Sequence, residues 1–212
     1  MQKKYQCYSA GPGLFPRDLP NGGREDWDEA QKRVRKLNET ISNNPLFDVI
    51  TPSNESLVYW LERERARVCM LTDMLYATRS DIVFADLTPF GGREPDSGTV
   101  VEAVACALSG GLLVLWSDPL TTFAKKYHDA DVHPDTELDE YYNLMIEQLY
   151  QYSWEAHFGF SRPVFEGLES AVKETAAQLK DHGLARTNLL QKFDSTKTFD
   201  IVGAVERLLY TV

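Results

Sequence analysis

Two short and almost wholly apolar runs constrain the fold of this chain most. Residues 81–87 read Asp-Ile-Val-Phe-Ala-Asp-Leu, and residues 112–116 read Leu-Leu-Val-Leu-Trp. A continuous apolar run of this length is typical of a strand that is buried on both faces. The small residues at 99–109 between them predict a helix, which ends at Gly110-Gly111. A strand, a helix and a second strand in succession predict two parallel neighbours in one sheet.

The segments before this unit repeat the alternation. Strands are expected at 6–10 and 47–51, and helices at 25–42 and 55–78, where apolar residues recur with helical spacing. This order predicts an α/β fold with an open, mostly parallel Rossmann-like or flavodoxin-like sheet flanked by helices.

The chain after residue 117 predicts mostly helices. We expect one helix at 139–152 and another that starts with Pro163 and runs to 180, whereas 199–209 fits a helix or a strand. The predicted organisation is a core at residues 1–153 and a helical C-terminal extension at 154–212, which packs on the core within a single domain. The aromatic residues at the start of the extension suit either a packing cluster or a base-stacking surface: Trp154, Phe158, Phe160 and Phe165.

Composition excludes several classes of function. The formal net charge of −10 argues against binding to a nucleic-acid backbone, which needs clustered cations. No apolar run approaches the ~20 residues of a membrane-spanning helix, and the first residues lack the apolar stretch of a secretory signal, so a cytoplasmic location is expected. Cys7, Cys69 and Cys106 follow no disulfide or metal-site spacing, and we expect reduced thiols. His128 and His133 lack a third ligand nearby, so no metal site is expected.

The segment Asp96-Ser-Gly-Thr-Val-Val-Glu102 follows the predicted strand at 81–87. Ligands of open α/β sheets bind at the carboxyl ends of the strands, and Gly98 would allow a close backbone approach there. Glu102 is expected in the first turn of the next helix, where the helix dipole favours an ionised carboxylate. Such a carboxylate suits the nucleophile of a glycosyl transfer. The same residues also fit a capping box, with Thr99 as N-cap and Glu102 at the third helical position.

Two more carboxylates extend this candidate site. Asp73 precedes the strand at 81–87, and Asp96 opens the motif. Taken singly, each suits a structural role, as a solvated helix residue or as a turn or cap residue. Together with Glu102 they would surround one site, where one acid could protonate a leaving base while another attacks the sugar. Clustered carboxylates also raise the pKa of one member.

The motifs resemble those of one enzyme family. The chain reads Tyr-Ser-Ala-Gly-Pro-Gly-Leu-Phe at 8–15, Ser-Asp-Ile-Val-Phe-Ala-Asp at 80–86, and Asp-Ser-Gly-Thr-Val-Val-Glu-Ala-Val-Ala-Cys-Ala at 96–107, with Asp73 between the first two. This set is similar to that of nucleoside 2-deoxyribosyltransferases, over residues 1 to about 150. The resemblance implies that Glu102 is a nucleophile that forms a covalent deoxyribosyl intermediate. It implies that Asp73 and Asp96 bind the base and handle its proton, and that Tyr8 positions the nucleophile.

The resemblance also implies substrate contacts and partners. Gly11, Phe15 and Gly98 are expected at the substrate, and Asn143 of a neighbouring subunit is expected at the sugar 5′-hydroxyl. The implied substrates are 2′-deoxynucleosides and free nucleobases, in a homo-oligomer that needs no cofactor. The preference between purines and pyrimidines stays open.

Two alternative functions remain open. The first is an N-glycosidase of 2′-deoxynucleoside 5′-monophosphates, which would use the same glutamate and would need a cation such as Arg17 or Arg93 for the phosphate. The second is a non-catalytic nucleotide sensor, in which Glu102 would only cap its helix.

Overall fold

The computed structural model describes residues 4–12, 23, 26–50, 62–90, 94–120 and 144–187. Its strands are β1 (Tyr5–Ala10), β2 (Phe47–Ile50), β3 (Ile82–Asp86), β4 (Leu112–Ser117) and β5 (Phe165–Glu166). Its helices are α1 (Trp27–Ser42), α2 (Glu62–Arg79), α3 (Ser97–Leu108), α5 (Leu144–Phe158) and α6 (Leu168–His182). The segment 199–209 lies outside the described residues.

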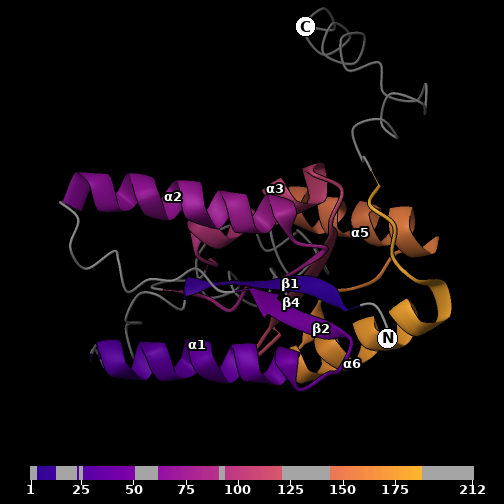
Figure 1. Cartoon of the computed structure of the whole chain (residues 1–212), viewed down its shortest axis with the longest axis horizontal. Helices are drawn as coiled ribbons and strands as arrows, with labels where there is room; N and C mark the ends of the chain where they lie inside the picture. The colour runs from indigo at the N-terminus through magenta and orange to yellow at the C-terminus, as the bar shows by residue number, and fades with distance from the viewer. Residues whose placement is uncertain are drawn as a thin grey trace, which may run out of the picture.

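The described strands form one parallel sheet with the order β2-β1-β3-β4-β5. Helices α2, α3 and α5 cover one face, and α1 and α6 cover the other (Figure 1). The predicted open α/β fold is therefore confirmed, in its flavodoxin-like form. The strand order changes direction between β1 and β3, and ligands of such sheets bind in the crevice at that point.

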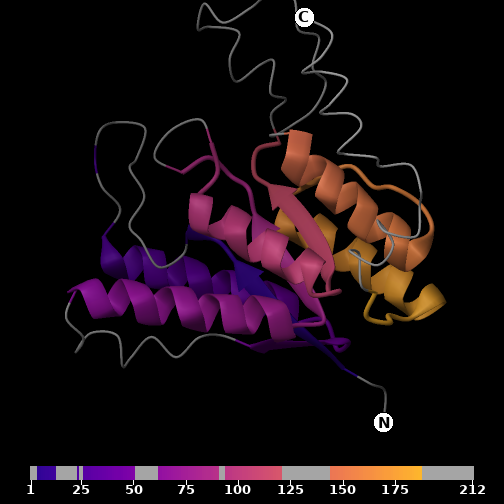
Figure 2. The same ribbon diagram turned by 90° about the horizontal axis from the view of Figure 1, so that it is seen from above.

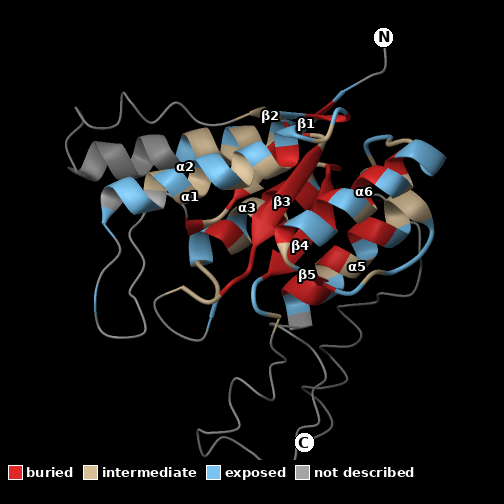
Figure 3. Cartoon of the chain, turned by 90° about the horizontal axis from the view of Figure 1, so that it is seen from below, coloured by how far each residue is buried: buried red, intermediate tan, exposed pale blue. Residues whose placement is uncertain are grey.

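The two apolar runs that defined the prediction are the central strands β3 and β4. Every residue of both strands is buried, and they form the core of the sheet (Figure 3). Burial on both faces explains why neither strand alternates polar and apolar residues. The buried thiols of Cys7 and Cys106 are free, as predicted, while the side chain of Cys69 is not described.

The prediction that Pro163 begins a helix is wrong. The residues after it form the short strand β5, which pairs with β4 at Trp116 and Ser117. Helix α6 begins only after Gly167, whose φ of 77° suits glycine. The other end lies close to the predicted one at 180, since α6 ends at His182 and is followed by Gly183, whose φ is 68°. A two-residue strand carries no periodicity, so the pattern could not reveal it.

Side chains of helix α5 form hydrogen bonds with the outer edge of β4, where no neighbouring strand pairs with it. Because β5 pairs only with the end of β4, the backbone of Leu113 needs other partners. Its N–H donates to Ser153 Oγ at 3.0 Å, and its carbonyl accepts from Trp154 Nε1 at 3.0 Å. Figure 2 shows α5, in orange, beside this strand. The predicted boundary between residues 153 and 154 thus falls inside α5, between the two residues that make these bonds.

Trp154 is also the centre of an aromatic cluster. Its ring centroid lies 5.0 Å from that of Phe158, 6.0 Å from that of Phe160 and 5.7 Å from that of Phe165. Trp154 itself is completely buried. Of the two interpretations of these residues, the structure supports the packing cluster.

Two negative observations apply to the described part of the chain. No helix there is long and apolar enough to cross a bilayer. No group of His, Cys, Asp and Glu side chains among the same residues could hold a metal ion. His128 and His133 lie outside the described residues.

The bond from Leu113 to Ser153 leads to a stability prediction. Ser153→Ala leaves the buried N–H of Leu113 without an acceptor, so we expect a loss of about 1–3 kcal/mol in the free energy of unfolding. Urea unfolding followed by circular dichroism measures this loss. The exposed Ser161→Ala variant is the control and should unfold like the wild type. Equal stability of the two variants would contradict the role given to Ser153.

Candidate active site

Tyr8 occupies the middle of the candidate site. It lies on β1, next to the point where the strand order changes, and only 5% of its surface is exposed. Its ring stacks on that of Tyr76 from α2, with centroids 6.2 Å apart and planes 20° apart. The stack fixes the direction of the Tyr8 hydroxyl. Tyr76 lies one helical turn after Asp73, a spacing that the sequence shows but that no motif marked.

The hydroxyl of Tyr8 interacts by hydrogen bonding with two carboxylates, those of Glu102 on α3 and Asp73 on α2. Burial raises the pKa of the Tyr8 hydroxyl far above its usual range, and the nearby charges of Glu102 and Asp73 raise it further. Tyr8 therefore keeps its proton and acts as a donor. The structure brings together three of the predicted residues, from three separate elements.

The two carboxyl groups share an environment that disfavours negative charge. Burial raises the pKa of Glu102 from 4.5 to about 8, helped by the charges of Asp73 and Asp96 and opposed by the hydrogen bond from Tyr8. Burial raises the pKa of Asp73 from 3.8 to about 6, again opposed by Tyr8. The Oε2 atom of Glu102 is buried and has no hydrogen-bond partner among the described residues. Both pKa values lie above their usual range, so the pair of carboxyl groups can retain a proton near neutral pH.

The expectation that Glu102 lies in the first turn of its helix, where the dipole favours an ionised carboxylate, is wrong. Helix α3 begins at Ser97, so Glu102 lies in the second turn, and the first turn contains no acidic residue. The dipole acts mainly within the first turn of a helix. Burial therefore decides the protonation of Glu102 in the free protein.

The prediction of a capping box formed by Thr99 and Glu102 is also wrong. The N-cap of α3 is Asp96, whose Oδ2 accepts from the N–H of Thr99 at 2.9 Å and from its hydroxyl at 3.2 Å. Thr99 is inside the helix and buried, and Glu102 does not cap. A Cβ on Gly98 would lie 2.9 Å from Asp96 Oδ2, so glycine leaves room for the capping carboxylate. Asp96 therefore caps α3. Its negative charge also raises the pKa of Glu102.

Gly11 lies where β1 ends beside β3. A Cβ at this position would be 3.1 Å from the Cβ of Asp86, the last residue of β3. Glycine therefore allows the two chain segments to approach closely at the carboxyl edge of the sheet. Four further residues named from the sequence lie outside the described residues: Phe15, Arg17, Arg93 and Asn143.

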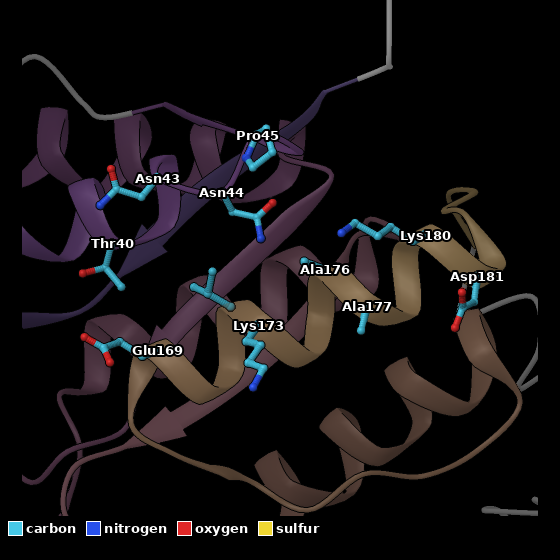
Figure 4. A pocket seen from close by; sticks show the side chains of 11 residues that line it. Thr40, Asn43, Asn44, Pro45, Glu169, Lys173, Ala176, Ala177, Lys180 and Asp181 are labelled. Atoms are coloured by element: carbon cyan, nitrogen blue, oxygen red, sulfur yellow. The ribbon is translucent and has the colours of Figure 1, made fainter.

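Two described cavities lie apart from this cluster. One of about 590 Å³ lies between α1 and α6 (Figure 4), and one of about 670 Å³ lies at the ends of β3, β4 and β5. Both are on the face of the sheet that α1 and α6 cover. Neither is lined by Tyr8, Asp73 or Glu102. The size of a cavity therefore does not identify the candidate site, which is marked by the interaction of Tyr8 with Glu102 and Asp73.

The raised pKa of Glu102 predicts how Glu102→Gln changes stability with pH. The carboxyl binds its proton more tightly in the folded protein, with a pKa of about 8 against 4.5 for the free group. Wild-type stability therefore falls between about pH 4.5 and pH 8 and then levels off, whereas the neutral amide has no such loss. We expect the variant to gain on the order of 1–3 kcal/mol over the wild type across this interval. Urea unfolding at pH 5, 7 and 9 measures the gain, with the exposed Glu155→Gln as control. A difference that is constant from pH 5 to pH 9 would contradict the prediction.

Comparison with known proteins agrees with this fold. A 2-desoxiribosyltransferase from Leishmania mexicana matches with a TM-score of 0.56 and 20% sequence identity, over 85% of this chain and 99% of that one. A CMP N-glycosidase from Clostridium botulinum matches with a TM-score of 0.41 and 12% identity, over 81% and 98% of the two chains. No family model and no curated protein matches the chain. The resemblance seen in the motifs thus extends to three dimensions, and the chain has the fold of a 2-deoxyribosyltransferase.

Proposed function

We propose that this protein transfers a 2-deoxyribosyl group between nucleobases, with Glu102 as the nucleophile. The observation that carries the proposal is the cluster in which the Tyr8 hydroxyl interacts with both Glu102 and Asp73. Splitting an N-glycosidic bond needs a nucleophile and an acid close to each other. The fold shared with the Leishmania mexicana enzyme is consistent with this activity.

In the first step Glu102 attacks the anomeric carbon of a 2′-deoxynucleoside. The bond from that carbon to the base nitrogen breaks, and an ester to Glu102 forms. Asp73 gives its proton to the departing base. In the second step a new base attacks the ester, Asp73 takes its proton, and the Glu102 carboxylate is released. Two inversions give net retention at the anomeric carbon.

The attack needs the proton on Asp73 and an ionised Glu102. Burial raises the pKa of both carboxyl groups, so either can hold a proton near neutral pH. The Tyr8 hydroxyl interacts with both groups, so it can accept a proton from Glu102 as it gives its own to Asp73. Asp96 suits the acid role less well, since its carboxylate is engaged with Thr99 at the start of α3.

The cations that a nucleotide N-glycosidase would need for the substrate phosphate, Arg17 and Arg93, lie outside the described residues. The proposal of an uncharged deoxynucleoside as substrate therefore rests on the family resemblance. A sensor in which Glu102 only caps its helix conflicts with the observed N-cap, Asp96.

The remaining parts of the proposal come from the family resemblance. They are nucleobases as acceptors, a homo-oligomer in which Asn143 of a neighbouring subunit reaches the sugar, a cytoplasmic location, and a reaction without a cofactor. Phe15, Gly11 and Gly98 are proposed to line the substrate site.

Removing the nucleophile tests the proposal directly. Glu102→Ala should lower the exchange of deoxyadenosine with cytosine by about a thousandfold or more while the protein stays folded. Brief exposure of the wild type to deoxyadenosine should add one deoxyribosyl group to the peptide that contains Glu102, as measured by mass spectrometry. Glu155→Gln is the control for both measurements. Loss of deoxyadenosine at the same rate without an acceptor base would instead indicate a hydrolase, and full activity of Glu102→Ala would end the proposal.

Removing the Tyr8 hydroxyl should move the pH profile. The hydroxyl lowers the pKa values of Glu102 and Asp73, so Tyr8→Phe raises both. Attack needs an ionised Glu102, and the acidic limb of kcat/KM should therefore move to higher pH by about one unit. Tyr76→Phe keeps the stacked ring and is the matched control. An acidic limb that does not move in Tyr8→Phe would contradict the role given to this hydroxyl.

A further inference from the structure

The helix pair α2 and α3 has an apolar outer surface. The two helices pack side by side on one face of the sheet (Figure 2). Asp73 is the only charged residue from 68 to 78, and Glu102 is the only one from 97 to 108. Both interact with the Tyr8 hydroxyl, so both point towards the sheet. Over these ranges the surface that faces away from the sheet therefore has no charged side chain.

Large apolar side chains of this helix pair are exposed. They are Met70, Leu71 and Leu75 on α2 and Val101 and Leu108 on α3, each with between 39% and 55% of its surface exposed. Leu71 and Leu75 are one helical turn apart, and Val101 and Leu108 are two turns apart, so each pair lies on one side of its helix. A helix that is apolar all round is usually covered by another element. Exposed apolar side chains that gather on one surface mark an interaction site.

The described part of the chain ends beside this surface. The guanidinium group of Arg186 donates to the carbonyls of Thr78 and Ser80 at 3.0 and 2.7 Å, just after α2. The N–H of Thr187 donates to the carbonyl of Gly110, just after α3, at 3.1 Å. A Cβ on Gly110 would lie 2.7 Å from the carbonyl oxygen of Thr187, so glycine allows this close approach. These contacts hold residue 187 at the carboxyl ends of α2 and α3.

The sequence that follows contains an apolar stripe of its own. Apolar residues recur there with the spacing of one side of a helix, and they are Ile201, Val202, Val205, Leu208, Leu209 and Val212. The charged residues at 200, 206 and 207 fall on the opposite side of such a helix. An isolated helix of this length is marginal in water, and its stability comes from packing of its apolar side. The segment 201–212 therefore needs an apolar surface to pack against.

We propose that residues 201–212 dock as a helix on the outer surface of α2 and α3 of the same chain. Residues 188–200 connect the anchored Thr187 to this segment, and a connection of 13 residues can span up to about 45 Å. The distance to cover is shorter, since α2 rises only about 10 Å from residue 71 to residue 78. A flexible connection of this kind gives an effective concentration on the order of millimolar. It therefore favours this segment over a separate molecule, such as a second copy of the chain.

Photocrosslinking of the full chain tests which surface the segment contacts. With benzoylphenylalanine in place of Leu209, on the apolar side, irradiation should link this position to peptides from α2 or α3 of the same molecule. The product should migrate as a monomer in a denaturing gel, and mass spectrometry identifies the linked peptides. The same group in place of Arg207, on the charged side, is the matched control and should give about tenfold less of this product. Links between two chains, or links to other parts of the molecule, overturn the proposal.

A change in the apolar surface gives a second measurement. Trypsin should cleave after Arg207 slowly in the wild type, because the docked segment has to detach first. Leu75→Asp places a charge on the exposed side of α2 and should raise the rate of this cleavage about tenfold, with circular dichroism to show that the variant is folded. Met145→Asp, on the exposed side of α5, is the control and should be cleaved like the wild type. Equal rates in all three proteins overturn the docking. Neither measurement needs turnover, so both are independent of the proposed transfer reaction.

Discussion

The pairing of β1 with both β2 and β3 is the constraint on which the candidate site depends. This register places Tyr8 beside Val83, with its ring on the face that α2 and α3 cover. Asp73 and Glu102 then reach the same hydroxyl from two different helices. Since side chains alternate along a strand, a shift of one residue would turn Tyr8 to the other face and separate the three groups.

Much of the fold follows from the sequence because burial leaves a strong pattern. The central strands had to be continuously apolar, and helices had to connect parallel neighbours, so the parallel pairing of β3 with β4 was predictable from residues 81–87 and 112–116. The two wrong predictions, a helix that begins at Pro163 and a cap formed by Thr99, have local causes. Strand β5 has two residues, which is too few for a periodic pattern. The start of α3 contains two residues that could cap it, Asp96 and Thr99. Asp96 rather than Thr99 caps because Thr99 is buried inside the first turn.

The proximity of the three candidate residues was also predictable from the sequence, but the burial that shifts their pKa values was not. The motifs indicated Tyr8, Asp73 and Glu102, and the structure brings them together. From the sequence, the helix dipole was expected to favour an ionised Glu102. A dipole contributes about 0.3–1 kcal/mol at an exposed position in the first turn. Glu102 lies beyond that turn, and burial moves its pKa from 4.5 to about 8, each unit corresponding to about 1.4 kcal/mol. Burial therefore prevails, and a sequence does not give the burial of one carboxylate.

The Oε2 atom of Glu102 connects stability with function. It is buried and lacks a hydrogen-bond partner among the described residues. By contrast, both the N–H and the carbonyl of Leu113 at the edge of β4 form hydrogen bonds with side chains of α5. A buried carboxylate oxygen without a hydrogen-bond donor costs stability, and a hydroxyl of a bound sugar that donates to Glu102 Oε2 would remove this cost.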